Sequence, residues 1–542
     1  MAGIDTDEWS TNSTETTTIT LTRLSANGSK HELSHVASFK PTFTHQLFGE
    51  QEQIFGYKGL KTDIQVLEHC PRTRITIKYD KKFPKQGDVE ADDVEDVWRE
   101  IIDEDAFVDE ETYLNKAKAV EQQKPAGELC HSGEIAPSSN YEVWHGRLST
   151  PAVYESFTAM DFLSPLLIDG GSTITESPDL STNHNWRIFS VYRKDASTKD
   201  RHSLVGYATV YTLYHFSPDY KPSFPAGSGT ESEDQGAKAD ADEPCTRRIA
   251  QFVVLPPYQN QGVGQFLYAA IYNHYYKDAS TKRLIVESPS NDFDDLRDVS
   301  DLVFLHQLEQ CKSIKINTSY NPPKSASKKG KTPDTANKPS FEKSLMLDMD
   351  ILSSLQRDMK IPSRQFQRIV EIQLMAQLPR SVRPAIEPPT TKPTAADLHH
   401  YRLWSLLVKE RLVRQHGDAL TELEHEDRIL RLNETLHSIG LDYARLLSKV
   451  ERAEARTKVV PETIPGTKSR KEKRKLDDSD QSEDEAEAET KRRKVNEVVP
   501  QMESTGEISS EKGATQNIIV PTQAEDPASH EPSQTSSSKQ SS

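Results

Sequence analysis

The chain has 542 residues, of which 34% are hydrophobic and 28% charged, and its formal net charge is −17. With so few apolar residues one continuous core is excluded, so we expect two or three folded domains with solvated segments between and after them. The acidic charge argues against direct DNA binding and suits a basic partner, although it is also what solubility alone would require.

Four cysteines, Cys70, Cys130, Cys245 and Cys311, are scattered without the spacing of metal ligands or a redox pair. We therefore expect reduced thiols in a nuclear or cytosolic protein, and no bound metal. No apolar run is long enough to span a membrane, and the Thr-rich, acidic N-terminus is unlike a secretory signal.

Residues 1–18 are expected to be disordered, and residues 19–133 to form a small mixed α/β domain. Within it, Thr73–Tyr79 alternates like a half-buried strand, and Asp93–Ile102 has the spacing of an amphipathic helix.

Residues 138–318 alternate between strand and helix patterns. The strands are expected at Trp186–Tyr192, Val205–Tyr214, Arg248–Leu255 and Arg283–Glu287. Between the last two, Leu267, Ala270, Ile271 and Tyr275 form one helical stripe, so a right-handed crossover joins two parallel strands. Residues 222–243, rich in Gly, Ser, Asp and Glu, are expected to be a disordered loop.

The remainder divides into a linker at 319–340, a helical region at 341–457 and a disordered tail at 458–542. One helix is expected to begin with Ser363 as N-cap and to stop at Pro379. Two basic clusters in the tail, Lys468–Lys475 and Lys491–Lys494, are typical of a bipartite nuclear localisation signal or of a solvated charged tail. The fold class is therefore α/β (α+β), with an N-terminal mixed domain, a central mixed sheet flanked by helices and a helical C-terminal part.

The sharpest local motif is Gln259-Asn-Gln-Gly-Val-Gly264, which follows a strand and opens a helix. Glycines allow close backbone approach to an anion, and N–H groups at a helix start point at it, so a pyrophosphate is a natural ligand. The spacing fits neither a Rossmann nor a Walker loop. Taken alone, a plain glycine-rich turn explains the motif equally well.

This motif resembles the coenzyme A pyrophosphate signature of the Gcn5-related N-acetyltransferases, in which the preceding strand splays from its neighbour. The resemblance implies acetyl-CoA as co-substrate, with pantetheine held by the backbone of Phe252, Val253 and Val254. The remaining cofactor contacts that it implies are Gln259, Asn260, Gln261, Gly262, Val263, Gly264, Gln265 and Ser290.

Transfer to a lysine also needs a base, because the ammonium has a pKa near ~10.4 and must lose a proton before attack. Glu287 ends the last expected strand, at the edge where ligand crevices open. An ordinary exposed glutamate at a strand end is the alternative.

Several further motifs resemble one family within that superfamily, the type B histone acetyltransferase catalytic subunits. They are Thr44–Gly49, Phe55–Leu60, Glu90–Glu95, Val205–Tyr207 with Thr209–Tyr211, and Leu296–Asp298, in the family's order. The resemblance implies acetylation of a glycine-flanked lysine in the tail of free histone H4. It also implies a WD-repeat histone-binding partner subunit and a place in both nucleus and cytoplasm.

By the same resemblance, Glu287 is the general base and Asp169 a second carboxylate near the lysine. Contacts to the histone tail are implied for Glu50, Gln51, Glu52, Trp186, Tyr211, Thr212 and Leu213. Carboxylates attract a basic tail, and an aromatic wall can cover a lysine stem. Ser288 stands where the family usually has Asp, which puts a paired carboxylate in doubt.

Two other functions remain open from the sequence. One is acetylation of small amines or protein N-termini, which would not need an acidic turn at Glu50. The other is a histone chaperone or scaffold with a vestigial acetyl-CoA loop, which the intact motif and Glu287 disfavour.

Overall fold

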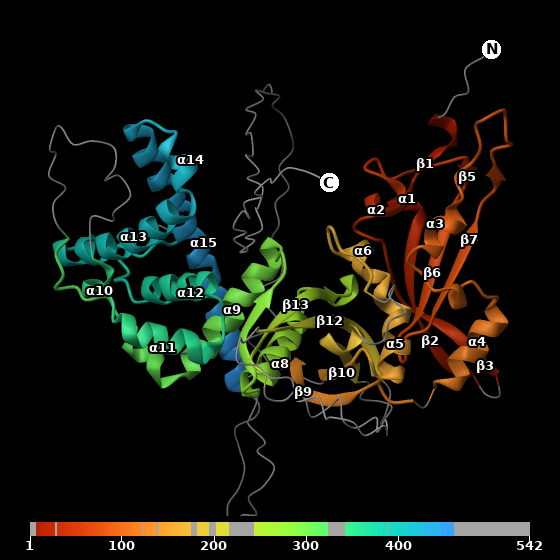
Figure 1. Cartoon of the computed structure of the whole chain (residues 1–542), viewed down its shortest axis with the longest axis horizontal. Coiled ribbons are helices and arrows are strands. Elements are labelled where there is room, and N and C mark those ends of the chain that lie inside the picture. Colours follow the sequence, from red (N-terminus) through yellow and green to blue (C-terminus); the bar gives the residue numbers. More distant parts are fainter. Residues whose placement is uncertain are drawn as a thin grey trace, which may run out of the picture. The chain divides into compact units, whose positions relative to one another are not determined.

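Two larger β-sheets, two two-stranded sheets, the helices packed on them and a set of C-terminal helices make up the part of the chain described by a computed structural model (Figure 1). The described residues are 7–27, 30–121, 123–136, 139–174, 182–194, 202–215, 243–322, 342–387 and 390–459. Nearly all of the expected loop at 222–243, most of the linker at 319–340 and the tail with its basic clusters lie outside them.

The N-terminal part is built on a four-stranded sheet of order β3-β2-β6-β7, in which β2 and β6 are parallel and the other pairs antiparallel. Alternate residues of its strands, such as Ile19, Leu21, Ile64 and Val66, are buried. The strands are β1 Ser10–Asn12, β2 Thr17–Asn27, β3 Lys30–Phe39, β4 Gln53–Phe55, β5 Tyr57–Lys58, β6 Lys61–Leu67, β7 Thr73–Lys78 and β8 Lys81–Lys82. The helices are η1 Asp7–Trp9, α1 Ser13–Thr16, α2 His45–Phe48, α3 Val94–Arg99, η2 Glu104–Ala106 and α4 Glu110–Ala119.

The expectation that residues 1–18 are disordered is wrong from Asp7 onward. β1 pairs antiparallel with β4, and β2, which begins at Thr17, pairs in parallel with β6. The Ser13 hydroxyl lies 2.7 Å from that of Thr44. This polar segment is ordered by partners distant in sequence, which its composition does not reveal.

The central sheet has the order β14-β13-β12-β11-β10-β9, and only its β13–β14 pair is parallel. Its strands are β9 Glu128–Ala136, β10 Ser139–Arg147, β11 Trp186–Lys194, β12 His202–Tyr214, β13 Cys245–Val254 and β14 Thr281–Val286. Its helices are α5 Pro151–Asp161, α6 Leu163–Leu167, η3 Thr182–Asn185, η4 Pro256–Tyr258, α8 Val263–Lys277, α9 Asn291–Gln307 and η5 Glu309–Ser313. The four expected strands are confirmed, but the domain boundary expected after Gly133 falls inside β9 and is wrong.

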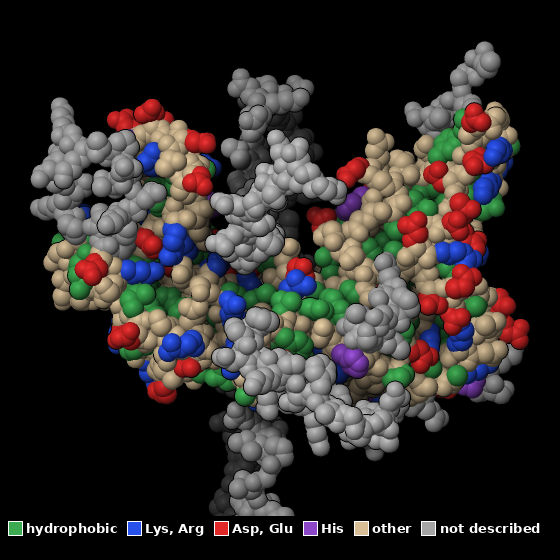
Figure 2. Space-filling model, viewed as in Figure 1, with side chains coloured by type: hydrophobic (Ala, Val, Ile, Leu, Met, Phe, Trp, Pro, Cys, Tyr) green, Lys and Arg blue, Asp and Glu red, His purple; other side chains and the backbone are tan. Residues whose placement is uncertain are grey.

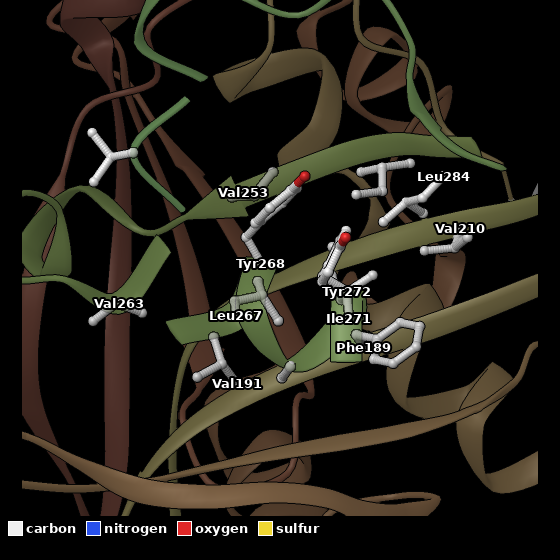
Figure 3. Close-up of a cluster of buried hydrophobic side chains, with 14 of the residues drawn as sticks. Phe189, Val191, Val210, Val253, Val263, Leu267, Tyr268, Ile271, Tyr272 and Leu284 are labelled. Carbon is white, nitrogen blue, oxygen red and sulfur yellow. The ribbon is translucent and has the colours of Figure 1, made fainter. Parts of the chain in front are cut away.

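Helix α8 packs on one face of this sheet and connects the parallel strands β13 and β14. The expected stripe is confirmed, since Leu267, Ala270, Ile271 and Tyr275 are each at most 2% exposed. Figure 3 shows side chains of α8 among those of β11 to β14. Helix α5 covers the opposite face, where the rings of Phe157 and Tyr207 lie 5.5 Å apart.

The C-terminal part is helical, as expected. Its helices are α10 Lys343–Met346, α11 Met349–Met359, α12 Ser363–Ala376, α13 Ala395–Gln415, α14 Gly417–Thr421 and α15 His425–Val459. Ser363 is not the N-cap of α12; Pro362 holds that position without a side-chain bond, and the Ser363 hydroxyl accepts a hydrogen bond from Gln356 instead. Of the helices in the described ranges, none combines the length and apolarity needed to cross a membrane.

Charge is distributed unevenly over these parts. On the face in Figure 2, acidic side chains gather around α3 and α4, whereas the C-terminal helices carry both signs. The net negative charge is therefore concentrated toward the N-terminal domain on this face, where it can attract a basic partner.

A buried polar network joins α8, α9 and α12. Tyr268 donates to Asp301 at 2.9 Å, and the Gln365 amide donates to both Asp301 and Asp298 at 3.0 Å. Arg368, which like Gln365 lies on α12, forms an ion pair with Asp298. Burial raises the pKa of Asp301 to about 7, despite the opposing effects of Arg297 and these hydrogen bonds.

We expect Asp301→Asn to weaken the pH dependence of stability between pH 5 and 8. Because the folded pKa is raised, Asp301 contributes stability that is complete below its unfolded pKa near ~3.9 and is lost as pH rises through about 7. Urea unfolding of both proteins at pH 5, 6, 7 and 8 measures this difference. Identical pH profiles would show that Asp301 ionises in the folded protein as easily as in the unfolded one.

Candidate active site

The parallel pair β13–β14 separates partway along its length. Its register ends at Ile249 and Val286, followed by a 2.9 Å bond from the Glu287 N–H to the Ile249 carbonyl. β13 then continues to Val254 alongside β12 alone. The splayed edge implied by the resemblance is therefore present, directly beside Glu287.

Strand alternation determines which backbone groups face this open edge. The Leu255 N–H donates to Val205 of the β12 side at 2.9 Å, so Val253 also directs its backbone groups toward β12. The N–H and C=O groups of Phe252 and Val254 consequently point to the open edge. Of the three residues expected to hold pantetheine, the geometry favours Phe252 and Val254 over Val253.

A β-bulge at Ala250 changes which face the side chains occupy. Ile249 pairs with Val210 and Gln251 with Thr209, which leaves Ala250 as the extra residue. Phe252, beyond the bulge, packs its ring 4.9 Å from Phe293 of α9. The bulge lies where β13 leaves β14, so it bends the strand at the mouth of the gap.

The expected anion-binding turn connects η4 to α8. Asn260 and Gly262 have left-handed backbones, with φ of 59° and 93°, and Gly262 is the N-cap of α8 without a side-chain cap bond. The Gln259 and Gln261 amides donate to the carbonyls of Val254 and Pro257 at 2.9 and 2.8 Å. These glutamines thus fasten the turn to β13 and η4, and the backbone N–H groups at the helix start remain for an anion.

Other expected cofactor residues take structural positions around this turn. Val263 is buried in the core, and Gln265 lies half-buried in the first turn of α8. A Cβ on Gly264 would lie 2.6 Å from Leu296 of α9, so glycine permits the close contact of these helices. Ser290 is the N-cap of α9 and accepts from the Phe293 N–H at 3.2 Å.

Glu287 lies immediately after β14, on the same sheet face as Arg248. Its Oε2 is 3.2 Å from the Arg248 Nε, and the two side chains are 45% and 31% exposed. The Arg248 guanidinium also lies 5.6 Å from the centre of the Tyr211 ring. Sequence reasoning missed Arg248, which carries no motif signal of its own and meets Glu287 only through the strand register.

Trp186 and Tyr211 place their rings next to each other on this face, and the contacts with a histone tail expected of them stay predictions. Their ring centroids lie 4.8 Å apart at 62°, and they are register partners on β11 and β12. Leu213 lies two residues after Tyr211 on β12, so its side chain is on the same sheet face, and it is half-buried. Thr212 points its side chain to the opposite face, where Arg247 donates to its hydroxyl, so its expected contact with a histone tail, which stays a prediction, would have to use the backbone.

The acidic turn is divided between structural and exposed residues. Glu52 accepts from the Thr44 N–H at 2.7 Å and from the Thr14 hydroxyl at 3.1 Å. Burial raises its pKa, but these hydrogen bonds outweigh burial and the net pKa is lowered. Glu50 and Gln51 are exposed and can still meet a peptide.

Asp169, the second expected carboxylate, is 78% exposed and lies 3.8 Å from the His45 imidazole. It follows α6 and is therefore placed by elements other than those that place Glu287. Its assigned role near the lysine stays a prediction.

A cluster of Cys130, His145 and His274 brings three possible metal ligands within 4.8 Å of one another. The Arg187 guanidinium lies 2.6 Å from the His145 Nδ1. Burial, aided by Arg187, lowers the pKa of His145 to about 3 and that of His274 to about 4. A cation so close to the imidazole opposes binding of a metal ion there.

Known proteins resemble this chain over nearly its whole length. Residues 9–169 match a family described as histone acetyl transferase HAT1 N-terminus. A histone acetyltransferase type B catalytic subunit of Gibberella zeae is 34% identical over 493 residues, which cover 87% of this chain and 96% of the relative. The Neurospora crassa protein of the same name is 34% identical over 521 residues, which cover 90% and 98%.

A solved aminoglycoside acetyltransferase from a soil metagenome aligns with 30% of this chain and 84% of its own at 15% identity, with a TM-score of 0.19, too low to support an argument. The sequence relatives carry the assignment, because the matches cover almost the full length of both proteins. The chain belongs to the family of histone acetyltransferase type B catalytic subunits.

Proposed function

We propose that this protein transfers an acetyl group from acetyl-CoA to a glycine-flanked lysine in the N-terminal tail of newly made, free histone H4. The observation that carries the proposal is the position of Glu287, at the point where β14 separates from β13. A base at this point is next to the end of β13, whose backbone groups are no longer paired with β14. In cells, such a reaction would contribute to chromatin assembly and DNA repair.

The described residues fit an acetyl-CoA co-substrate. The turn before α8 offers backbone N–H groups and the positive end of a 15-residue helix to a pyrophosphate. The open edge of β13 offers the backbone N–H and C=O of Phe252 and the N–H of Val254 to an amide-bearing arm, while the Val254 carbonyl accepts from the Gln259 amide. When bound, acetyl-CoA supplies an activated thioester to the site.

Glu287 would act as general base in this reaction. It accepts the ammonium proton of the lysine, through one water molecule or directly, and the free amine then attacks the thioester carbonyl carbon. The C–S bond breaks, coenzyme A leaves as a thiolate, and the remaining proton on the nitrogen passes to that thiolate. An N–H group on the open edge of β13 would stabilise the charge on the carbonyl oxygen. Trp186 and Tyr211 would cover the lysine stem.

Two further parts of the proposal concern the partner subunit, which rests on the family alone, and the cellular compartment. A WD-repeat histone-binding subunit would be its partner in a type B complex. The basic clusters Lys468–Lys475 and Lys491–Lys494 support a nuclear share of the protein beside a cytoplasmic one.

The test is acetyl transfer from labelled acetyl-CoA to an H4 tail peptide and to an H3 tail peptide of equal length. We expect transfer to the H4 peptide to be faster than transfer to the H3 peptide. In a second measurement, we expect Gly262→Val to raise the KM for acetyl-CoA, because a valine at this position disfavours the left-handed backbone by about 1–2 kcal/mol. The KM for the peptide should stay unchanged. Absence of transfer despite tight peptide binding would favour a scaffold, and preference for small amines would favour the other class of acetyltransferase.

A further inference from the structure

A place suited to a cationic group exists beside Glu287. It is formed by the Glu287 carboxylate on one side and the Tyr211 ring on the other, with Trp186 behind the ring at 4.8 Å between centroids. A carboxylate with an aromatic face is a favourable setting for an ammonium or a guanidinium. In this structure the Arg248 guanidinium lies in that place.

Arg248 is held there by few contacts. Within the described ranges, its Nε is shielded from solvent and has no hydrogen bond of good geometry, so the 3.2 Å approach to Glu287 is an ion pair only. The neighbouring Arg247 is held much more firmly. Its guanidinium donates to Thr212, Asp278, Ser280 and Thr281 on the other sheet face.

We propose that Arg248 occupies, in the free enzyme, the place that the substrate lysine ammonium must take to reach Glu287. This rests on the proposed role of Glu287 as the base. Lysine binding then requires the guanidinium to be displaced, and both cations compete for one carboxylate. The competition penalises every acceptor by the same amount.

That penalty makes Arg248 a determinant of how tightly any acceptor binds, and it leaves the ratio of affinities between acceptors unchanged. A long histone tail has additional contacts, such as the exposed Glu50, that offset the displacement of Arg248. A short peptide or a small amine has none, so its affinity is lower at the same penalty. Because an exposed ion pair contributes about 0.2–1 kcal/mol, the expected effect on binding is about 1.4- to 5-fold.

The test compares Arg248→Gln with Arg283→Gln as a matched control. Arg283 is an exposed arginine on β14 with the same strand parity as Glu287, four residues earlier. Two acceptors are used, a five-residue lysine peptide and a twenty-residue H4 tail peptide. We expect Arg248→Gln to lower the KM of the short peptide and that of the long peptide by the same factor, about 1.4- to 5-fold, so that their ratio stays unchanged. Arg283→Gln should change neither KM.

Equilibrium binding of a fluorescent short peptide, measured by anisotropy, gives a second readout independent of turnover. With Glu287 present, Arg248→Gln should tighten binding of the peptide. In the Glu287→Gln background it should not, because the competition for the carboxylate is already absent. Arg248→Lys should bind the peptide as the wild type does. An unchanged or higher KM for Arg248→Gln, with an active wild type and an inactive Glu287→Gln, overturns this inference alone. Full activity of Glu287→Gln overturns the proposed base and this inference together.

Discussion

Glu287→Gln is expected to lower kcat for acetylation of an H4 tail peptide at least ~100-fold, the usual contribution of a general base. The amide cannot accept the ammonium proton, although it keeps the size of the side chain and leaves the backbone bond to Ile249 intact. The KM for acetyl-CoA should change little, because the turn before α8 is untouched. Single-turnover measurement of labelled acetyl transfer separates this step from product release.

Asp169→Asn measured beside it serves as the control carboxylate. Asp169 is 78% exposed, and its ion-pair partner among the described residues is His45 at 3.8 Å. Its replacement should therefore lower kcat less than the replacement of Glu287 does. If the two variants exchange their effects, Asp169 is the base. Equal melting temperatures of both variants and the wild type would exclude loss of folding as the cause.

Glu371→Ala is expected to lower the free energy of unfolding by about 3–5 kcal/mol, the cost of breaking a buried ion pair. The carboxylate of Glu371 accepts from Arg411 at 2.8 and 2.9 Å and from the Tyr443 hydroxyl at 2.9 Å. Its removal leaves an arginine that is only 9% exposed without its partner. Because α12, α13 and α15 meet at this pair, the loss should unfold the C-terminal helices first.

Urea unfolding followed by tryptophan fluorescence is a direct measurement, since the Trp404 indole donates to the Glu371 carbonyl at 3.0 Å. The double variant Glu371→Leu/Arg411→Met should recover much of the loss, as apolar replacement of a buried pair is often tolerated. Glu434→Ala, which breaks an exposed 3.7 Å pair with Arg431, is the control and should cost less than about 1 kcal/mol. Similar losses for Glu371→Ala and Glu434→Ala would contradict the prediction.

The elements of the central sheet were predictable because their signals are local. The strand at Trp186–Lys194, the helix from Val263 and the turn between β13 and that helix all follow from residue patterns and from glycine. The family motifs were predictable for the same reason, as each is a short run in a fixed order. The domain boundary expected after Gly133 was wrong because β9 is polar and mostly exposed, and only its partner β10 identifies it as a strand.

The parts that were not predictable depend on register between distant segments. Arg248 meets Glu287, and Thr212 faces away from Tyr211, because of the alignment of β12, β13 and β14. The bulge at Ala250 reverses the side-chain alternation of β13, and no residue type near it in the sequence signals a bulge. The Glu52 carboxylate accepts hydrogen bonds from Thr44 and Thr14 because the segment around Ser13 packs against the turn. No sequence pattern near Glu52 indicates this packing.

The unpaired edge of β13 has a consequence for the solubility of the ligand-free protein. Free strand edges are templates on which other chains can add strands and aggregate. Here the exposed stretch is confined to the few residues between Ile249 and Leu255, with β14 ending at its start and α9 packed alongside. Because this stretch is short and lies between the end of β14 and α9, a narrow extended ligand can bind to it but a strand of another chain cannot. The geometry that admits a substrate therefore also protects against self-association.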